Sequence, residues 1–594
     1  MPPGDQRDPS RLEDPRRSSR GRSPAASGQY RLIVSITIAV LALPILVDLV
    51  VSGRKRVFAY LAADSFYYLQ VARNVVHHGS VSFDGRHATN GFQPLWQGVL
   101  SAAQGGASLL GVGPTGMLYA SLLIGLGVLV GAVVLLASAF RAGYGHLTPV
   151  FVIVPLGFYA VLFAPIWIYS GALRSSGINP FEGPMPLYGT LWSYVNGMET
   201  PLVVAAFALL AWAFTKRPVS APRSGLVTGV ALSLLVLARL DLVFVAIGVL
   251  GTLGACAWIR RDRAVFRLAA TAGVVVTVVL VAYVIVNRLY AGSWLPVSGT
   301  VKTTFPNPTL GNWQDLRSLL EHPTFLGPER WYRQFPTIVG VLIAAAFLGT
   351  SRLPTLLRSR LESPLDRYRL LLSGTATGVI ALSAYDFFFV ANYNQGHWYY
   401  PVTTLFVSLA ILDWLAKFRT PSVLVITTCV IVTLVAFVTL GRRADYHVRM
   451  ADFYFRGAPL LTASYHGNVP NLLEVDDGID LYALNAEGMS GVGLTLDQQG
   501  VQAYRADRLL QLAVQRGFGD IVSLDYLNAT GLTDQTSSSA LRARMEQLLT
   551  RPGHSAPNLS GYDFSVERRL PPGVLATQWP GTDGSYVVIR VRSR

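Results

Sequence analysis

Residues 115–140 read TGMLYASLLIGLGVLVGAVVLLASAF, an apolar run without a charged side chain. At 1.5 Å per residue, a helix of about 20 apolar residues crosses the ~30 Å hydrocarbon core of a bilayer. Similar runs recur along the 594 residues, of which 51% are hydrophobic and 14% charged. A soluble domain carries roughly 25% charged residues. The composition therefore excludes an ordinary soluble protein and predicts a polytopic α-helical membrane protein.

The apolar runs predict about eleven membrane-spanning helices. The first is expected at 31–51 as an uncleaved anchor, because no small-residue cleavage site follows it. The others are expected at 115–140, 147–169, 198–215, 224–239, 241–259, 265–287, 335–351, 369–391, 398–416 and 421–440. Residues 1–30 are polar and rich in Pro, Ser and Arg, so they are predicted to be a disordered basic tail in the cytoplasm.

The distribution of Lys and Arg predicts the orientation, since short cytoplasmic loops carry an excess of both. With the tail inside, the cytoplasmic loops are Arg141–His146, Lys216–Arg223, Arg260–Arg263, Arg352–Arg369 and Lys417–Arg419. This agreement requires that the stretch 92–112 lies at the outer interface and does not cross the membrane. Arg54, Lys55 and Arg56 fall outside, against the rule. The chain is predicted to reside in the plasma membrane with its large polar segments outside.

Those outer segments include the first loop, 52–114, and the region 441–594, which is long enough for a soluble domain. A helix at Arg508–Arg516 and strands at 521–524 and 586–591 predict an α/β or α+β fold there. The acids Asp476, Asp477 and Asp480 could bind a cation or belong to a turn. Residues 31–440 then form the transmembrane domain.

Charge and cysteine content narrow the class further. The net charge of +15 is spread over the tail and short loops, not along one surface stripe, which argues against nucleic-acid binding. Cys256 and Cys429 both lie inside apolar runs and predict neither a disulfide framework nor a zinc site.

The first outer loop contains the most informative pattern. Residues 63–78 fit an amphipathic helix on which Phe66, Leu69 and Arg73 share a face. Asp64 stands at the start of this helix, where the helix dipole favours an ionised carboxylate. Two interpretations remain open from the residues alone: Asp64 caps the helix, or it performs chemistry.

The motifs of this loop are ADSFYYLQVARN at 63–74, FDG at 83–85 and TNGFQPLW at 89–96. Further motifs are NGMETP at 196–201, ARLD at 238–241, LPVSGTVK at 295–302 and GHWYYP at 396–401. Together they resemble the GT-C superfamily of membrane glycosyltransferases, which use polyprenyl-phosphate-linked sugars and include protein O-mannosyltransferases and mycobacterial arabinosyltransferases. The resemblance covers roughly residues 31–440. The superfamily often has two acids where this chain has only Asp64.

The resemblance implies a role for each polar motif residue. Asp64 would be the base for the acceptor hydroxyl, since a sugar transfer needs one. The donor phosphate would be held by Arg239, Lys302, Arg73 and His397. The sugar or acceptor would be bound by Glu199, Asn90, Trp96, Asp241, Trp398, Tyr399 and Tyr400. No metal site and no certain cofactor are predicted, and a divalent cation is left open.

Each role has a plainer alternative. Arg239 could simply pair with Asp241, and Lys302 could be a snorkelling loop lysine. Glu199 could complement a helix dipole, and the aromatic residues could form the belt at the membrane interface. His397 could be an interfacial histidine without a catalytic role.

The predicted function is an inverting transfer of a sugar from polyprenyl phosphate to an extracytoplasmic glycan, lipid or protein of the cell envelope. Arabinose or mannose is expected, because the excess of Arg over Lys suggests a GC-rich actinobacterium. The alternatives are a lipid or sugar transporter or flippase, and a non-catalytic scaffold with an outer binding domain. A transporter would show broken helices in two related halves. The chain has Pro155 in one span and no matching half.

Overall fold

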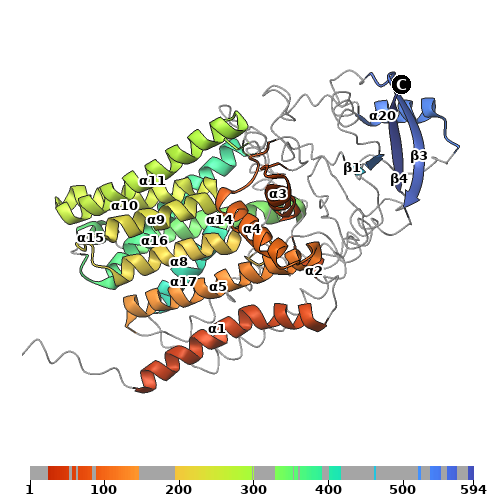
Figure 1. Ribbon diagram of the computed structural model, residues 1–594. Helices are drawn as coiled ribbons and strands as arrows, with labels where there is room; N and C mark the ends of the chain where they lie inside the picture. The colour runs from red at the N-terminus through yellow and green to blue at the C-terminus, as the bar shows by residue number, and fades with distance from the viewer. Residues whose placement is uncertain are drawn as a thin grey trace, which may run out of the picture.

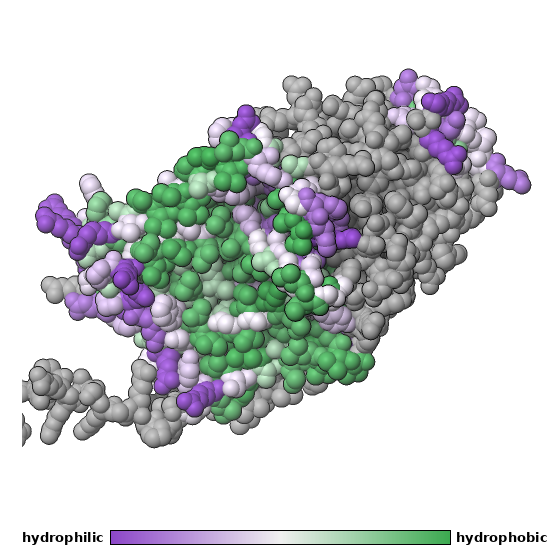
Figure 2. All heavy atoms as spheres, viewed as in Figure 1, coloured by the Kyte–Doolittle hydropathy of each residue, from purple (hydrophilic) through white to green (hydrophobic). Residues whose placement is uncertain are grey.

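A computed structural model gives the architecture of the chain. It describes residues 24–51, 57–61, 65–82, 88–145, 194–296, 299, 328–351, 353–358, 361–390, 401–416, 460–462, 520–522, 535–549, 558–570 and 586–594. Most of these residues form helices that pack side by side in one bundle (Figure 1). Figure 2 shows an apolar band over the sides of the bundle, with hydrophilic residues gathered at its ends. This distribution is that of a helical membrane protein.

Five of the described helices contain spans long and apolar enough to cross a membrane. They are α1 (Pro24–Val51), α5 (Pro114–Tyr144), α10 (Val243–Arg260), α11 (Arg263–Ala291) and α16 (Pro364–Phe389). Four further helices are apolar over 10–17 residues: α8 (Thr200–Lys216), α9 (Ser224–Ala238), α17 (Pro401–Leu415) and the later part of α14 (Pro328–Thr350). Helices are thus confirmed at nine predicted spans. The spans at 147–169 and 421–440 lie outside the described residues.

Short helices cover the ends of the bundle. At one end lie α2 (Val57–Tyr60), α3 (Ser65–His78) and α4 (Pro94–Leu109), and at the other lies α15 (Leu353–Arg358) (Figure 1). The 16-residue α4 packs against α3, α5 and α9 and is not among the helices long enough to cross a membrane. The 3₁₀ turn η3 (Leu240–Leu242) joins α9 to α10 at the same end as α3.

The predicted tail, residues 1–30, overlaps the start of α1, which begins at Pro24. Proline suits the first turn of a helix, where its missing N–H costs no hydrogen bond, and Ala25 and Ala26 follow with high helix propensity. The apolar run that starts at Leu32 then lets the helix extend toward the N-terminus across Gly28 and Gln29.

The helices α10 and α16 approach each other closely at three glycines, Gly248, Gly374 and Gly378. A Cβ on Gly378 would lie 2.5 Å from the Cα of Val245, and one on Gly248 would lie 2.4 Å from the carbonyl oxygen of Gly374. Only glycine permits such an approach of two backbones, as is typical of small-residue helix interfaces in membranes. This contact fixes η3, at the start of α10, against the later part of α16.

A small mixed sheet stands beside the bundle (Figure 1). Its strand order is β1 (Leu460–Thr462), β2 (Asp520–Val522), β4 (Tyr586–Ser593) and β3 (Tyr562–Leu570), with β1 and β2 parallel and the other pairs antiparallel. The helix α20 (Ser538–Leu549) contacts β3. The strand predicted at 586–591 is confirmed, and β2 overlaps the one predicted at 521–524. The helix predicted at 508–516 and the acids Asp476, Asp477 and Asp480 lie outside the described residues.

Candidate functional site

The centre of the candidate site is Arg239, which directly follows α9. Its extended backbone (φ −158°, ψ 113°) breaks the helix and turns the side chain into the bundle, where only 2% of the residue is exposed. The guanidinium donates two bonds to Asp241, from Nε to Oδ1 at 2.9 Å and from Nη2 to Oδ2 at 2.8 Å. Nη1 donates to Oε1 of Glu199 at 3.1 Å. Arg239 therefore binds two carboxylates with the forked geometry that guanidinium groups favour.

Glu199 reaches this cluster from the start of α8. It is almost fully buried, and its second oxygen, Oε2, accepts a bond from the hydroxyl of Tyr68 at 3.3 Å. A buried carboxylate is stable only when such partners replace water. The pairing between Arg239 and Asp241, given above as the plain alternative, is thus present, and Glu199 extends it to an ion-paired triad.

Tyr68 and Gln93 connect the triad to the helices of the first outer loop. The Tyr68 hydroxyl also accepts a bond from the backbone N–H of Gln93 at 3.1 Å. The side-chain oxygen of Gln93 in turn accepts from the N–H of Leu240 at 3.0 Å. This chain of bonds joins α3, the start of α4 and η3, three segments that are far apart in the sequence.

The turn before α8 brings the start of α3 close to the triad. Gly197 has φ +78°, and a Cβ there would lie 2.8 Å from the Cβ of Ser65, so the position requires glycine. The Gly197 carbonyl accepts a bond from Nε1 of Trp96 at 2.8 Å. The side chain of Asn196 accepts from the N–H of Met198 at 3.1 Å and shapes the turn. Ser65, the first residue of α3, immediately follows Asp64 in the chain.

Four described residues of the predicted site meet at this end of the bundle. Glu199, Arg239 and Asp241 form the triad, and Trp96 binds the turn beside it. The indole of Trp96 is fully buried, so in this structure it anchors α4 and presents no face to a ligand.

The remaining predicted residues either are not members of the triad or lie outside the described part. Asn90 is buried and donates to the carbonyl of Leu295 at 3.2 Å, which ties the first loop to the segment after α11. Arg73 lies on α3 and is half-buried. The predicted positions outside the described residues are Asp64, Lys302, His397, Trp398, Tyr399 and Tyr400.

Three residues of the cluster were not predicted from the sequence: Tyr68, Gln93 and Asp386. Asp386 lies near the end of α16, is 6% exposed, and interacts electrostatically with Asp241 and Arg239. An acidic residue inside a membrane-spanning apolar run is itself a functional signal, because placing a charged side chain in the bilayer costs free energy. That signal was available for Asp386, whereas Tyr68 and Gln93 are recognisable only through contacts with distant segments.

The cluster therefore contains three carboxyl groups and one guanidinium. Among the described residues, no group of three or more His, Cys, Asp or Glu side chains has the arrangement to hold a metal ion. Within the triad, the side chain of Asp241 is 18% exposed, against 2% for those of Arg239 and Glu199. Asp241 is thus the member that a ligand reaches most easily.

The sequence matches no known family model, and a comparison with curated proteins finds no relative.

Proposed function

We propose that this protein is an integral-membrane glycosyltransferase that moves a sugar from a polyprenyl-phosphate donor to an acceptor of the cell envelope. The single observation that supports this most strongly is the convergence of the resembling motifs. Residues 63–74, 89–96, 196–201 and 238–241 are separated by up to about 175 positions, yet contacts of Tyr68, Gln93 and Trp96 join them at one end of the bundle. A shared site explains why these segments resemble one superfamily together.

In the proposed reaction, the acceptor hydroxyl attacks the anomeric carbon of the donor sugar. Its proton passes to the carboxylate of Asp64, the bond from carbon to the phosphate oxygen breaks, and polyprenyl phosphate departs with the electron pair. A single displacement of this kind inverts the anomeric centre. Cations must stabilise the departing phosphate, and Lys302, His397 and Arg73 are proposed for this task.

The triad has a distinct role in this proposal. Arg239 was also expected to hold phosphate, but its Nε and Nη2 groups bind Asp241 and its Nη1 group binds Glu199. We propose that Arg239 mainly fixes Glu199 and Asp241. The exposed edge of Asp241 is suited to accept hydrogen bonds from sugar hydroxyls, since an ionised carboxylate is a strong acceptor.

The proposed orientation puts the triad on the outer side of the plasma membrane, with about eleven spans and the region 441–594 outside. Two features support it. The ends of α9 and α11 and the starts of α5 and α8 lie together with α3 and α4 (Figure 1). The basic turns that join α8 to α9 and α10 to α11 lie at the opposite end, as expected for cytoplasmic loops.

The test is turnover by the purified protein in liposomes, with polyprenyl-phosphate arabinose or mannose and envelope glycan as substrates and released polyprenyl phosphate as the readout. Asp64→Asn is expected to lower turnover by about 10²–10⁴-fold, because a general base contributes that much. The matched control is Asp366→Asn, which removes a carboxylate at the opposite end of the bundle. Equal turnover by wild type and Asp64→Asn would exclude the mechanism. Movement of the intact donor across the bilayer without release would favour the transporter.

A further inference from the structure

The end of the bundle opposite the triad has basic side chains that pair with no acidic side chain among the described residues. The turn between α8 and α9 contains Lys216, Arg217 and Arg223 and no acidic residue. Within the described part of the chain, none of the three forms an ion pair. In the turn between α10 and α11, by contrast, Arg260 pairs with Asp262 at 2.9 Å. The α8–α9 turn is therefore a local excess of positive charge.

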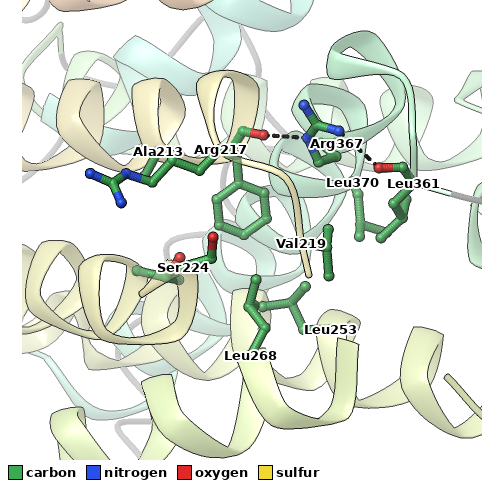
Figure 3. A pocket seen from close by; sticks show the side chains of 11 residues that line it. Ala213, Arg217, Val219, Ser224, Leu253, Leu268, Leu361, Arg367 and Leu370 are labelled. Atoms are coloured by element: carbon green, nitrogen blue, oxygen red, sulfur yellow. Dashed lines mark hydrogen bonds between the residues drawn. The ribbon is translucent and has the colours of Figure 1, made fainter. Parts of the chain in front are cut away.

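A recess opens beside this turn, between the ends of α8, α9, α10, α11 and α16 (Figure 3). It measures about 290 Å³ including its open mouth, and about 10 Å³ of that is available to the centre of a water molecule. Its walls are mostly apolar, from Phe214, Val219, Leu253, Leu268, Leu361 and Leu370. Its depth thus has room for little more than one water, so a larger ligand must bind at the mouth.

Two arginines line the recess, and they differ in their partners. Arg367 is buried and donates to the carbonyl oxygens of Phe214, Leu361, Glu362 and Thr215 at 2.7–3.0 Å. Its hydrogen-bonding capacity is thus used to hold the end of α8. The guanidinium carbon of Arg217 lies 5.7 Å from the ring centroid of Trp212, and its buried Nε atom has no hydrogen-bond partner among the residues that the structure describes. In Figure 3 the guanidinium of Arg217 points away from that of Arg367.

The start of α9 lies at the same place and directs the positive end of its helix dipole toward the turn. The N–H of Ser224 is bonded to the carbonyl of Ala221 at 3.0 Å, and the Ser224 hydroxyl to the carbonyl of Pro218 at 2.7 Å. Ser224 and Thr228, on the first turns of α9, line the recess. The positive end of a helix dipole and a guanidinium together favour an anion, above all a phosphate.

We propose that this mouth binds the phosphate of an anionic phospholipid from the leaflet at this end of the membrane. Arg217 donates to the phosphate, and Lys216 and Arg223 supply further positive charge. The acyl chains lie outside the recess along α9, where Leu226 and Val230 are exposed one turn apart. Trp258 is exposed near the end of α10, and exposed tryptophans at helix ends are typical of the membrane interface. Apolar surface directly below a cationic group distinguishes a lipid from free phosphate.

The test measures lipid retention by the full-length protein in detergent, with native mass spectrometry and thermal melting. Phosphatidylglycerol is the probe, and phosphatidylcholine and inorganic phosphate are the comparisons. We expect phosphatidylglycerol to bind more tightly than phosphatidylcholine, and inorganic phosphate to leave the melting temperature unchanged. Arg217→Gln is expected to weaken phosphatidylglycerol binding about fivefold, the value of one basic residue near an anionic surface.

The matched control is Arg288→Gln, because Arg288 also lies over a tryptophan, Trp294, at 5.5 Å, but at the other end of the bundle. It is expected to leave phosphatidylglycerol binding unchanged, and Arg217→Lys is expected to retain most of it. The proposal is overturned by equal binding of the two lipids, by an equal loss in the Arg217→Gln and Arg288→Gln variants, or by inorganic phosphate that competes with the lipid.

Discussion

At the scale of single residues, Arg239 determines whether the candidate site exists. Its guanidinium forms ion pairs with both Glu199 and Asp241 in a place from which water is largely excluded. Removing one partner of a buried ionic group leaves the others uncompensated, which costs far more than the net stabilisation by the pair. The triad is therefore expected to be sensitive to any change at this position.

Arg239→Ala is expected to lower the free energy of unfolding by about 3–5 kcal/mol, because it leaves two carboxylates buried without a cation. Arg239→Lys is expected to recover only part of this loss, since an ammonium cannot form the two parallel bonds to Asp241. Denaturant unfolding in mixed micelles measures both. The exposed Arg267→Ala is the control, and an equally small change in the free energy of unfolding for all three variants would contradict the description of the triad.

Tyr68 is expected to matter through its hydroxyl alone. Tyr68→Phe leaves the Glu199 oxygen and the Gln93 N–H without this partner. The free energy of unfolding is expected to fall by about 1–3 kcal/mol. If the hydroxyl acts through Glu199, the effects of Tyr68→Phe and Glu199→Gln on the free energy of unfolding are not additive. A double-mutant cycle measures the departure from additivity. Additive effects would mean that the bond is absent in solution.

At the scale of secondary-structure elements, the α10–α16 contact positions the later part of α16, and with it Asp386, against η3. Gly378→Ala would place a Cβ 2.5 Å from the backbone of Val245. Backbone atoms cannot move aside as the end of a side chain can. We therefore expect the free energy of unfolding to fall by at least the usual cost of overpacking, about 1–3 kcal/mol. Gly251→Ala on α10 meets nothing within 4 Å and is expected to leave the melting temperature unchanged or higher. A melting temperature equally unaffected by both changes would contradict this packing.

The C-terminal sheet offers a pH-dependent prediction. Hydrogen bonds from Arg594, at 2.9 Å, and from Ser538 lower the pKa of Asp563. A lowered pKa means that the ionised carboxylate stabilises the fold above the unfolded pKa of about 3.9, and that this contribution is lost as the pH falls through the folded value. Asp563→Asn is therefore expected to increase amide exchange in β3 and β4 at pH 7 but to match wild type near pH 2, as measured by hydrogen-exchange mass spectrometry.

The elements also show what the sequence can and cannot predict. Apolar runs located the helices because burial in lipid leaves an unambiguous length signal. Their starts were less accurate: α16 begins at Pro364, five residues before the predicted start, because Ser363 caps it and Pro364 suits its first turn. The acidic and basic members of the triad were predictable as charges near helix ends. Tyr68 and Gln93 were not, since their bonds cross 131 and 147 positions of sequence.

At the scale of the whole molecule, the two ends of the bundle differ in their chemistry. One end contains the buried triad beneath α3 and α4, and the other has the basic α8–α9 turn, whose cations form no ion pair within the described residues. The proposed function requires the triad end to face outward, because envelope acceptors are found there. The orientation rests on the basic turns and on the 16-residue α4 remaining at the interface.

The most direct measurement is the labelling of a single cysteine at position 64, in a chain whose Cys256 and Cys429 are replaced by serine. We predict that a membrane-impermeant maleimide labels Asp64→Cys in intact cells and that polyprenyl phosphate added to the membranes slows the labelling. Labelling that occurs only in inverted vesicles would put this residue on the cytoplasmic side and contradict the proposed site.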